Sequence, residues 1–146
     1  INLVKPKTKV TTPSTAAINA LKKLNIKKIS IFTPYSKALN NKVVDYFKEE
    51  NFKVTSNSYF DILNDSDIAK IDENYLYETL SKMNLNDAEA LFVSCTNLPT
   101  LSIIDKLEKK LNKIILSSNQ VLIWDTLQSI GKTNLIEGYG KLFKNN

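Results

Sequence analysis

The chain has 146 residues, of which 42% are hydrophobic, and a formal net charge of +5. This length suits one domain with a substantial core, no apolar run approaches the ~20 residues of a membrane helix, and a single cysteine excludes an internal disulfide. Every basic residue is lysine and histidine is absent, which excludes histidine-based zinc sites, Ser-His-Asp triads and arginine recognition of nucleic acid. We therefore expect one cytoplasmic domain, with neither a membrane nor a nucleic acid as partner.

Helical and strand-like patterns alternate along the chain: a helix comes first, and a strand and a helix then follow four times. Thr12 and Pro13 suit the start of the first helix and Asn25 its end, the second helix is expected to end near Asn51, and Gly131 suits the end of the last helix. The predicted helices are residues 13–24, 37–50, 73–83, 101–111 and 120–130, and the predicted strands are residues 28–33, 52–58, 91–95 and 113–116. This order predicts an α/β fold with a four-stranded parallel sheet and helices on both faces.

The one cysteine lies at the end of the third predicted strand, in the run Ser94-Cys95-Thr96-Asn97, and Thr100 then suits the N-cap of the next helix. A thiol in such a strand-to-helix turn lies near backbone N–H groups and the positive end of a helix, which favour a thiolate and bound anions. Cys95 is therefore the candidate reactive residue. The alternative, that Cys95 is a small hydrophobic residue in the core, remains open.

Ligands of open parallel sheets bind beyond the carboxyl ends of the strands. The uncharged side chains expected there are Thr33, Tyr35, Ser36, Asn64, Ser94, Cys95, Thr96, Asn97, Ser117, Ser118 and Asn119. Such neutral donors predict a pocket for a small anion such as a carboxylate, although Tyr35 and the asparagines also suit ordinary turns and caps. We expect no metal, because Cys95 is the only soft ligand, and no nucleotide, because glycine-rich phosphate motifs are missing.

Four motifs follow one another along the chain: Val10-Thr11-Thr12-Pro13, Phe32-Thr33-Pro34-Tyr35, Ser94-Cys95-Thr96-Asn97-Leu98 and Leu116-Ser117-Ser118-Asn119-Gln120. In this order they resemble the aspartate/glutamate racemase superfamily. The branch that they resemble most contains maleate cis-trans isomerases, arylmalonate decarboxylases and ectoine-utilisation racemase-like proteins. The resemblance runs from about Val10 to near Gly131.

In that superfamily two similar α/β halves face each other across a cleft, each half supplies a cysteine, and no cofactor is needed. The resemblance implies that Cys95 is the catalytic cysteine of the second half and that Tyr35 and Asn64 bind a substrate carboxylate. It also places Thr96 where a backbone N–H helps to hold a carboxylate. We count Asn97, from the same turn, among the substrate-binding residues.

The first half of the superfamily fold, with its own cysteine motif, is missing from this sequence. We expect residues 1–146 to form a single α/β domain, with residues 10–117 as the strand-helix core. Residues 118–146 would form a C-terminal helix and tail that pack on the first half. Three explanations stay open: the chain is part of a longer enzyme, two copies face one cleft in a homo-oligomer, or one cysteine suffices, as in the decarboxylase.

The resemblance implies a cofactor-independent isomerase or racemase of a small dicarboxylate or amino acid, with maleate cis-trans isomerisation as the best guess. The thiol would act as an acid or base on the substrate carbon. The alternatives are an arylmalonate-type decarboxylase, an aspartate or glutamate racemase, and a non-catalytic domain that keeps the anion pocket.

Overall fold

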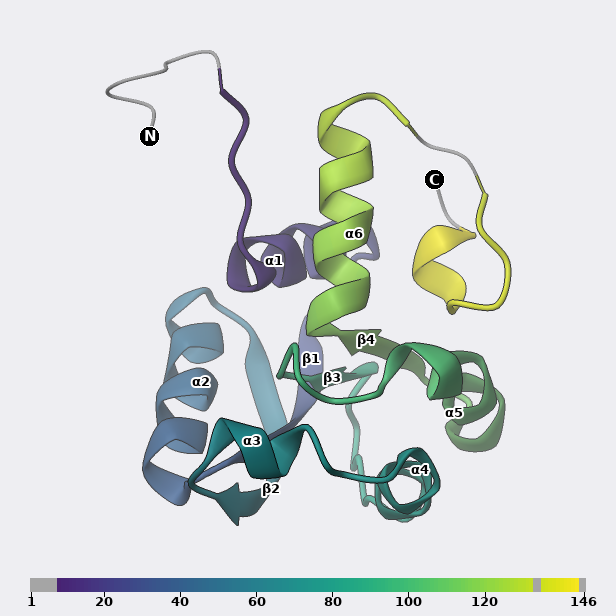
Figure 1. Ribbon diagram of the computed structural model, residues 1–146. Helices are drawn as coiled ribbons and strands as arrows, with labels where there is room; N and C mark the ends of the chain where they lie inside the picture. The colour runs from purple at the N-terminus through teal and green to yellow at the C-terminus, as the bar shows by residue number, and fades with distance from the viewer. Residues whose placement is uncertain (1–7, 133–134, 145–146) are drawn as a thin grey trace.

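The computed structural model describes residues 8–132 and 135–144. The described strands β1 (Lys28–Tyr35), β2 (Lys53–Ile62), β3 (Ala90–Val93) and β4 (Ile114–Ser117) form one parallel sheet in the order β2-β1-β3-β4. The helices are α1 (Pro13–Lys23), α2 (Lys37–Glu49), α3 (Asp65–Ile68), α4 (Glu73–Ser81), α5 (Ile104–Leu111) and α6 (Ser118–Ser129), with the 3-10 turns η1 (Leu101–Ile103) and η2 (Lys141–Phe143). Figure 1 shows the arrangement, which confirms the predicted fold class.

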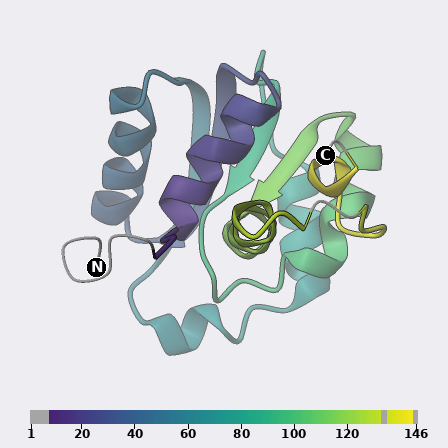
Figure 2. The same cartoon turned by 90° about the horizontal axis from the view of Figure 1, so that it is seen from above.

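Successive strand residues point to opposite faces of the sheet, and each face has its own apolar core. Ile31 of β1 and Phe92 of β3 pack with α1, α2, α6 and η2 on one face. Phe32 and Leu91 pack with α3, α4, α5 and η1 on the other. In the view of Figure 2, α6 is seen end-on beside α1, with which it is in contact. Because both faces are covered, β1, β3 and β4 are buried along nearly their whole length, as expected for a parallel sheet, whereas the edge strand β2 is largely polar and exposed.

The predicted ends of three helices are confirmed. Asn25, Asn51 and Gly131 follow α1, α2 and α6 with φ angles of 56°, 67° and 72°. After each of them, the next residue donates its N–H to the carbonyl five residues back. This is the Schellman closure, which needs a left-handed residue and so favours glycine or asparagine.

The strands end at other residues than predicted. β1 continues to Tyr35 and β2 to Ile62, so residues 59–62 extend the second strand beyond its predicted end at residue 58. The pairing continues across a bulge, in which Asp61 has a φ of 63° and accepts a hydrogen bond from the Lys37 N–H at 3.0 Å. β3 ends at Val93, so Cys95 lies in the following turn.

Two helix starts also differ from the prediction. α6 begins at Ser118, two residues early, because Ser117 and Gln120 form a capping box. Thr100 does not cap a helix with its side chain: its hydroxyl donates to the Leu98 carbonyl at 3.3 Å, and η1 precedes α5.

The described part of the C-terminal tail packs on this chain's own core. Leu142 and Phe143 are buried in the core that α1 and α6 share. The Gly140 N–H donates to Asp105 at 2.8 Å, and the Lys141 N–H donates to Glu108 at 2.9 Å. The predicted packing of residues 118–146 on another protein half stays a prediction.

Gly140 is the tightest point of this tail. Its φ is +88°, and a Cβ there would lie 2.6 Å from Ile104 Cγ2 and 2.9 Å from Gln120 Nε2. We expect Gly140→Ala to lower the free energy of unfolding by about 2–4 kcal/mol, as left-handed strain and overpacking add. Urea unfolding measures the change.

Gly138 offers the matched control for this prediction. It has the same φ of +88°, but a Cβ there meets nothing within 4 Å. Gly138→Ala should therefore show only the backbone strain of about 1–2 kcal/mol. Equal losses in the two variants would contradict the proposed close packing at Gly140.

Candidate functional site

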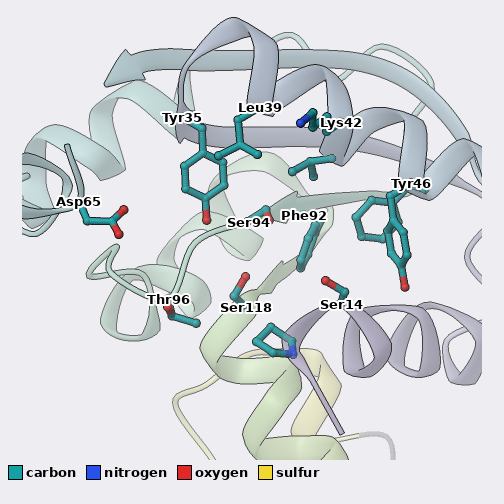
Figure 3. A pocket seen from close by; sticks show the side chains of 13 residues that line it. Ser14, Tyr35, Leu39, Lys42, Tyr46, Asp65, Phe92, Ser94, Thr96 and Ser118 are labelled. Atoms are coloured by element: carbon teal, nitrogen blue, oxygen red, sulfur yellow. The ribbon is translucent and has the colours of Figure 1, made fainter. Parts of the chain in front are cut away.

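The site lies where the strand order reverses. After β1 the chain forms β2 along one edge of β1, and it later returns to form β3 along the opposite edge of β1. Ligand sites of open α/β sheets form at such a point, beyond the carboxyl ends of the strands. A pocket of about 550 Å³ lies there, and its lining includes Tyr35, Lys42, Asp65, Ser94, Thr96 and Ser118 (Figure 3).

Cys95 is almost buried, with an exposed fraction of 5%, and it is outside the lining of this pocket, whereas its chain neighbours Ser94 and Thr96 belong to that lining. It is a member of the apolar cluster that also contains Phe32 and Leu98. Its Sγ accepts a hydrogen bond from the Asn97 backbone N–H at 3.3 Å, and the side chain of Tyr35 forms a hydrogen bond with it from the end of the neighbouring strand. The sulfur therefore has two polar neighbours, which distinguishes it from a cysteine enclosed by aliphatic side chains alone.

Tyr35 remains protonated beside this sulfur. Burial raises the pKa of Tyr35 above its usual range, and the hydrogen bond with Cys95, electrostatic repulsion from Cys95 and the charge of Asp65 raise it further. In Figure 3 the hydroxyl points into the pocket, with the Asp65 carboxylate on one side and Ser94 on the other. A neutral phenol held there is a hydrogen-bond donor for a thiolate or for an anionic ligand.

The structure brings Tyr35, Cys95, Thr96 and Asn97 together. Thr96 lines the pocket, whereas Asn97 contributes its backbone N–H to the sulfur and exposes its side chain. Asn64 is exposed just before α3, and its Nδ2 donates to Asp67 at 3.2 Å. Asn64 is outside the lining that the described residues form, although its neighbour Asp65 belongs to it. A substrate contact of Asn64 stays a prediction.

A buried polar network, which the sequence patterns did not indicate, supports the end of β1. Thr33 Oγ1 donates to Asn40 Oδ1 at 3.1 Å, and Asn40 Nδ2 donates to Asn57 Oδ1 at 2.8 Å. Thr33 and Asn40 are both fully buried. Because buried amides and hydroxyls lose stability when unpaired, this network fixes α2 against β1 and β2 beside Tyr35.

The pocket has charged lining residues in addition to the uncharged side chains expected at the strand ends. Lys42 of α2 and Asp65 of α3 both line it. Both charged residues lie on helices, whereas the candidate residues identified from the sequence lie at or after the strand ends. Lys42 follows Leu39 by three residues on α2, and this helical spacing was the available signal.

The described residues contain neither a cluster of metal ligands nor a membrane-spanning helix. Among residues 8–132 and 135–144, no three or more cysteine, aspartate or glutamate side chains gather in a way that could hold a metal ion. No helix in the described part of the chain has the length and apolarity that spanning a bilayer requires.

Comparison with known proteins identifies the family. The arylmalonate decarboxylase family matches the sequence over residues 5–143, nearly the whole chain. The chain belongs to the arylmalonate decarboxylase family. This result confirms the branch of the superfamily that the four motifs resemble.

Relatives with different reactions belong to the same group. The chain is 25% identical over 128 residues to maleate isomerase of Alcaligenes faecalis, and this match covers 87% of this chain and 51% of the relative. It is 27% identical over 136 residues to arylmalonate decarboxylase of Bordetella bronchiseptica, and this match covers 91% of this chain and 57% of the relative. The crystal structure of a maleate isomerase from Pseudomonas putida S16 with maleate has the same fold, with a TM-score of 0.92, 24% identity and coverage of 99% and 58%. The chain spans about half the length of the curated relatives it matches.

The raised pKa of Tyr35 gives a spectroscopic prediction. In the folded protein we expect Tyr35→Phe to leave the phenolate absorbance formed between about pH 9 and 11 unchanged, because Tyr35 does not ionise there. A stopped-flow pH jump reads this absorbance before unfolding. The unfolded chain ionises Tyr35 near pH 10, so its contribution to stability falls as the pH rises above about 10. Loss of one tyrosine's share of the absorbance in Tyr35→Phe would contradict the assignment.

Proposed function

We propose that the protein containing this chain is a cofactor-independent enzyme that acts on a small dicarboxylate, with Cys95 as a catalytic thiol. The proposed reaction is the cis-trans isomerisation of maleate to fumarate. The observation that carries the proposal is the Cys95 sulfur flanked by the Tyr35 hydroxyl and the Asn97 N–H beside the pocket. Relatives that are maleate isomerases, and membership of the family, support it.

In the proposed chemistry a thiolate first adds to the double bond of the substrate and later leaves again. A thiolate from the other half adds to one carbon of the double bond, and the electron pair moves onto the second carbon and into its carboxylate. Cys95, on the opposite side, protonates that carbon. The central bond, now single, rotates, Cys95 removes the proton again, and the thiolate leaves as the double bond re-forms.

The lining residues suit the charge that develops in this reaction. The neutral phenol of Tyr35 can donate to the enediolate-like carboxylate, and backbone N–H groups of the Thr96 turn can hold it as well. Lys42 brings a positive charge to the α2 side of the pocket, which favours a dianion. Tyr35, Thr96 and Lys42 would thus bind and orient the substrate while the thiols carry out the proton and bond changes.

A second protein half is part of the proposal. Leu39, at the rim of the pocket, exposes 44% of its surface, and the match to this chain covers only 51% and 57% of the two relatives. We propose that a first half with its own cysteine, or a second copy in a homo-oligomer, closes the pocket over Cys95. Asn64 and the α6 tail would contact that half or the substrate once it is in place.

Removal of the thiol tests the catalytic role. We expect Cys95→Ala in the full-length protein to lower kcat for maleate at least about 100-fold, because the acid–base group is lost. Proton NMR follows the appearance of fumarate. Ser81→Ala, on α4 and outside the pocket, is the control and should keep the activity. Turnover that survives in a folded Cys95→Ala variant would rule the role out.

Arylmalonate decarboxylation is the second candidate, favoured by the name of the matching family and by the single cysteine in this chain. In that reaction one carboxylate leaves as CO₂, its bonding electrons remain as an enediolate, and Cys95 delivers a proton to the carbon. Parallel assays with maleate and phenylmalonate separate the two. We expect fumarate from maleate; CO₂ release from phenylmalonate alone would favour the decarboxylase.

A further inference from the structure

The turn that carries Cys95 is tied to the sheet at its start and mostly to itself afterwards. The Ser94 N–H donates to the Phe32 carbonyl at 2.8 Å, and among the described residues this is the last backbone hydrogen bond from the turn to β1. Further along, the Asn97 N–H donates to the Cys95 sulfur, and the Thr100 N–H donates to the Leu98 carbonyl at 2.8 Å. Such a turn needs an external anchor to hold one conformation.

Asn119 supplies an anchor from a different element. Its Nδ2 donates to the Thr96 carbonyl at 2.9 Å. Asn119 is the second residue of α6, and the start of that helix is fixed by the Ser117–Gln120 capping box. Gln120 is fully buried and donates to the Tyr139 carbonyl at 2.6 Å. The donor amide of Asn119 therefore projects from a rigid part of the fold.

The Thr96 carbonyl and the Asn97 N–H belong to one peptide group. A trans peptide is planar, with its C=O and N–H pointing in opposite directions, and the described residues contain no cis peptide. When Asn119 draws the carbonyl toward α6, the N–H on the other side must face the sulfur. A flip of this peptide would lose both hydrogen bonds and turn the carbonyl dipole toward Cys95.

We infer that Asn119 is a positioning residue that locks the Thr96–Asn97 peptide so that its N–H faces the Cys95 sulfur. Two hydrogen bonds in series through one peptide also polarise each other, which strengthens the N–H donor. Asn119 does not need to touch the substrate for this effect. The catalytic consequence rests on the proposed function, whereas the geometry of the peptide can be measured without any turnover.

Two variants of Asn119 in the full-length protein separate the effect of its amide N–H donor from the effect of its side-chain shape. Asn119→Asp has the same shape but cannot donate to a carbonyl, and a carboxylate in the first turn of α6 favours the helix, so folding is retained. Asn119→Gln keeps an amide donor. We expect amide hydrogen exchange of Asn97, read by NMR, to accelerate about tenfold in Asn119→Asp and much less in Asn119→Gln.

Alkylation gives a second readout at the sulfur. The iodoacetamide rate at Cys95 is followed by peptide mass spectrometry at the same pH in the wild type and in both variants. We expect the rate to fall about tenfold in Asn119→Asp, where the N–H no longer faces the sulfur, and to recover in Asn119→Gln. Wild-type exchange and alkylation in Asn119→Asp, or equal losses in both variants with a lower melting temperature, would overturn the inference.

Turnover distinguishes a failure of this inference from a failure of the proposed function. We expect kcat to fall about tenfold in Asn119→Asp with little change in KM. If Cys95→Ala abolishes turnover while Asn119→Asp retains wild-type kcat and Asn97 exchange, the positioning role is wrong and the catalytic thiol stands. If Cys95→Ala retains turnover, the proposed function fails, and the Asn97 exchange rates still decide the peptide lock.

Discussion

The pairing of β1 with β3 determines where every part of the site lies. The two strands are parallel, with Phe32 opposite Val93, and the Ser94 N–H continues the ladder to the Phe32 carbonyl. Tyr35 and Cys95 follow this last pair by three and two residues, so the phenol and the thiol reach the same edge of the sheet. A slip of one residue would turn every side chain of β3 to the other face and move Cys95 away from Tyr35.

Around this pair the fold supplies support in layers. The buried Thr33–Asn40–Asn57 network holds β1 against α2, and the bulge at Asp61 fixes the start of α2 through the Lys37 N–H. On the other side, α6 holds the Cys95 turn through its first residues. Residues far apart in the chain are thereby made into one rigid frame for a reactive group that itself lies in a turn. Function on a turn held by a rigid scaffold is a general feature of α/β proteins.

Local signals in the sequence predicted the parts of the fold that depend on local chemistry. Asparagine or glycine after an amphipathic helix identified the ends at Asn25, Asn51 and Gly131, and strand-helix alternation predicted the sheet. The adjacency of Tyr35 and Cys95 followed from the rule that parallel strands end at one edge. Asp61 could not be foreseen as a bulge, because its conformation depends on the pairing of β2 with β1. Lys42 could not be assigned to the pocket, because which side of α2 faces it is decided by tertiary packing.

The connection between Gln120 and the Tyr139 carbonyl has a practical consequence. It places the described tail, with the buried Leu142 and Phe143, one residue from the amide that holds the Cys95 turn. A chimaera that grafts this domain onto another scaffold must therefore carry the chain through Phe143. Shortening it after α6 would uncover Gln120 and part of the core, and would disturb a thiol that is distant in sequence.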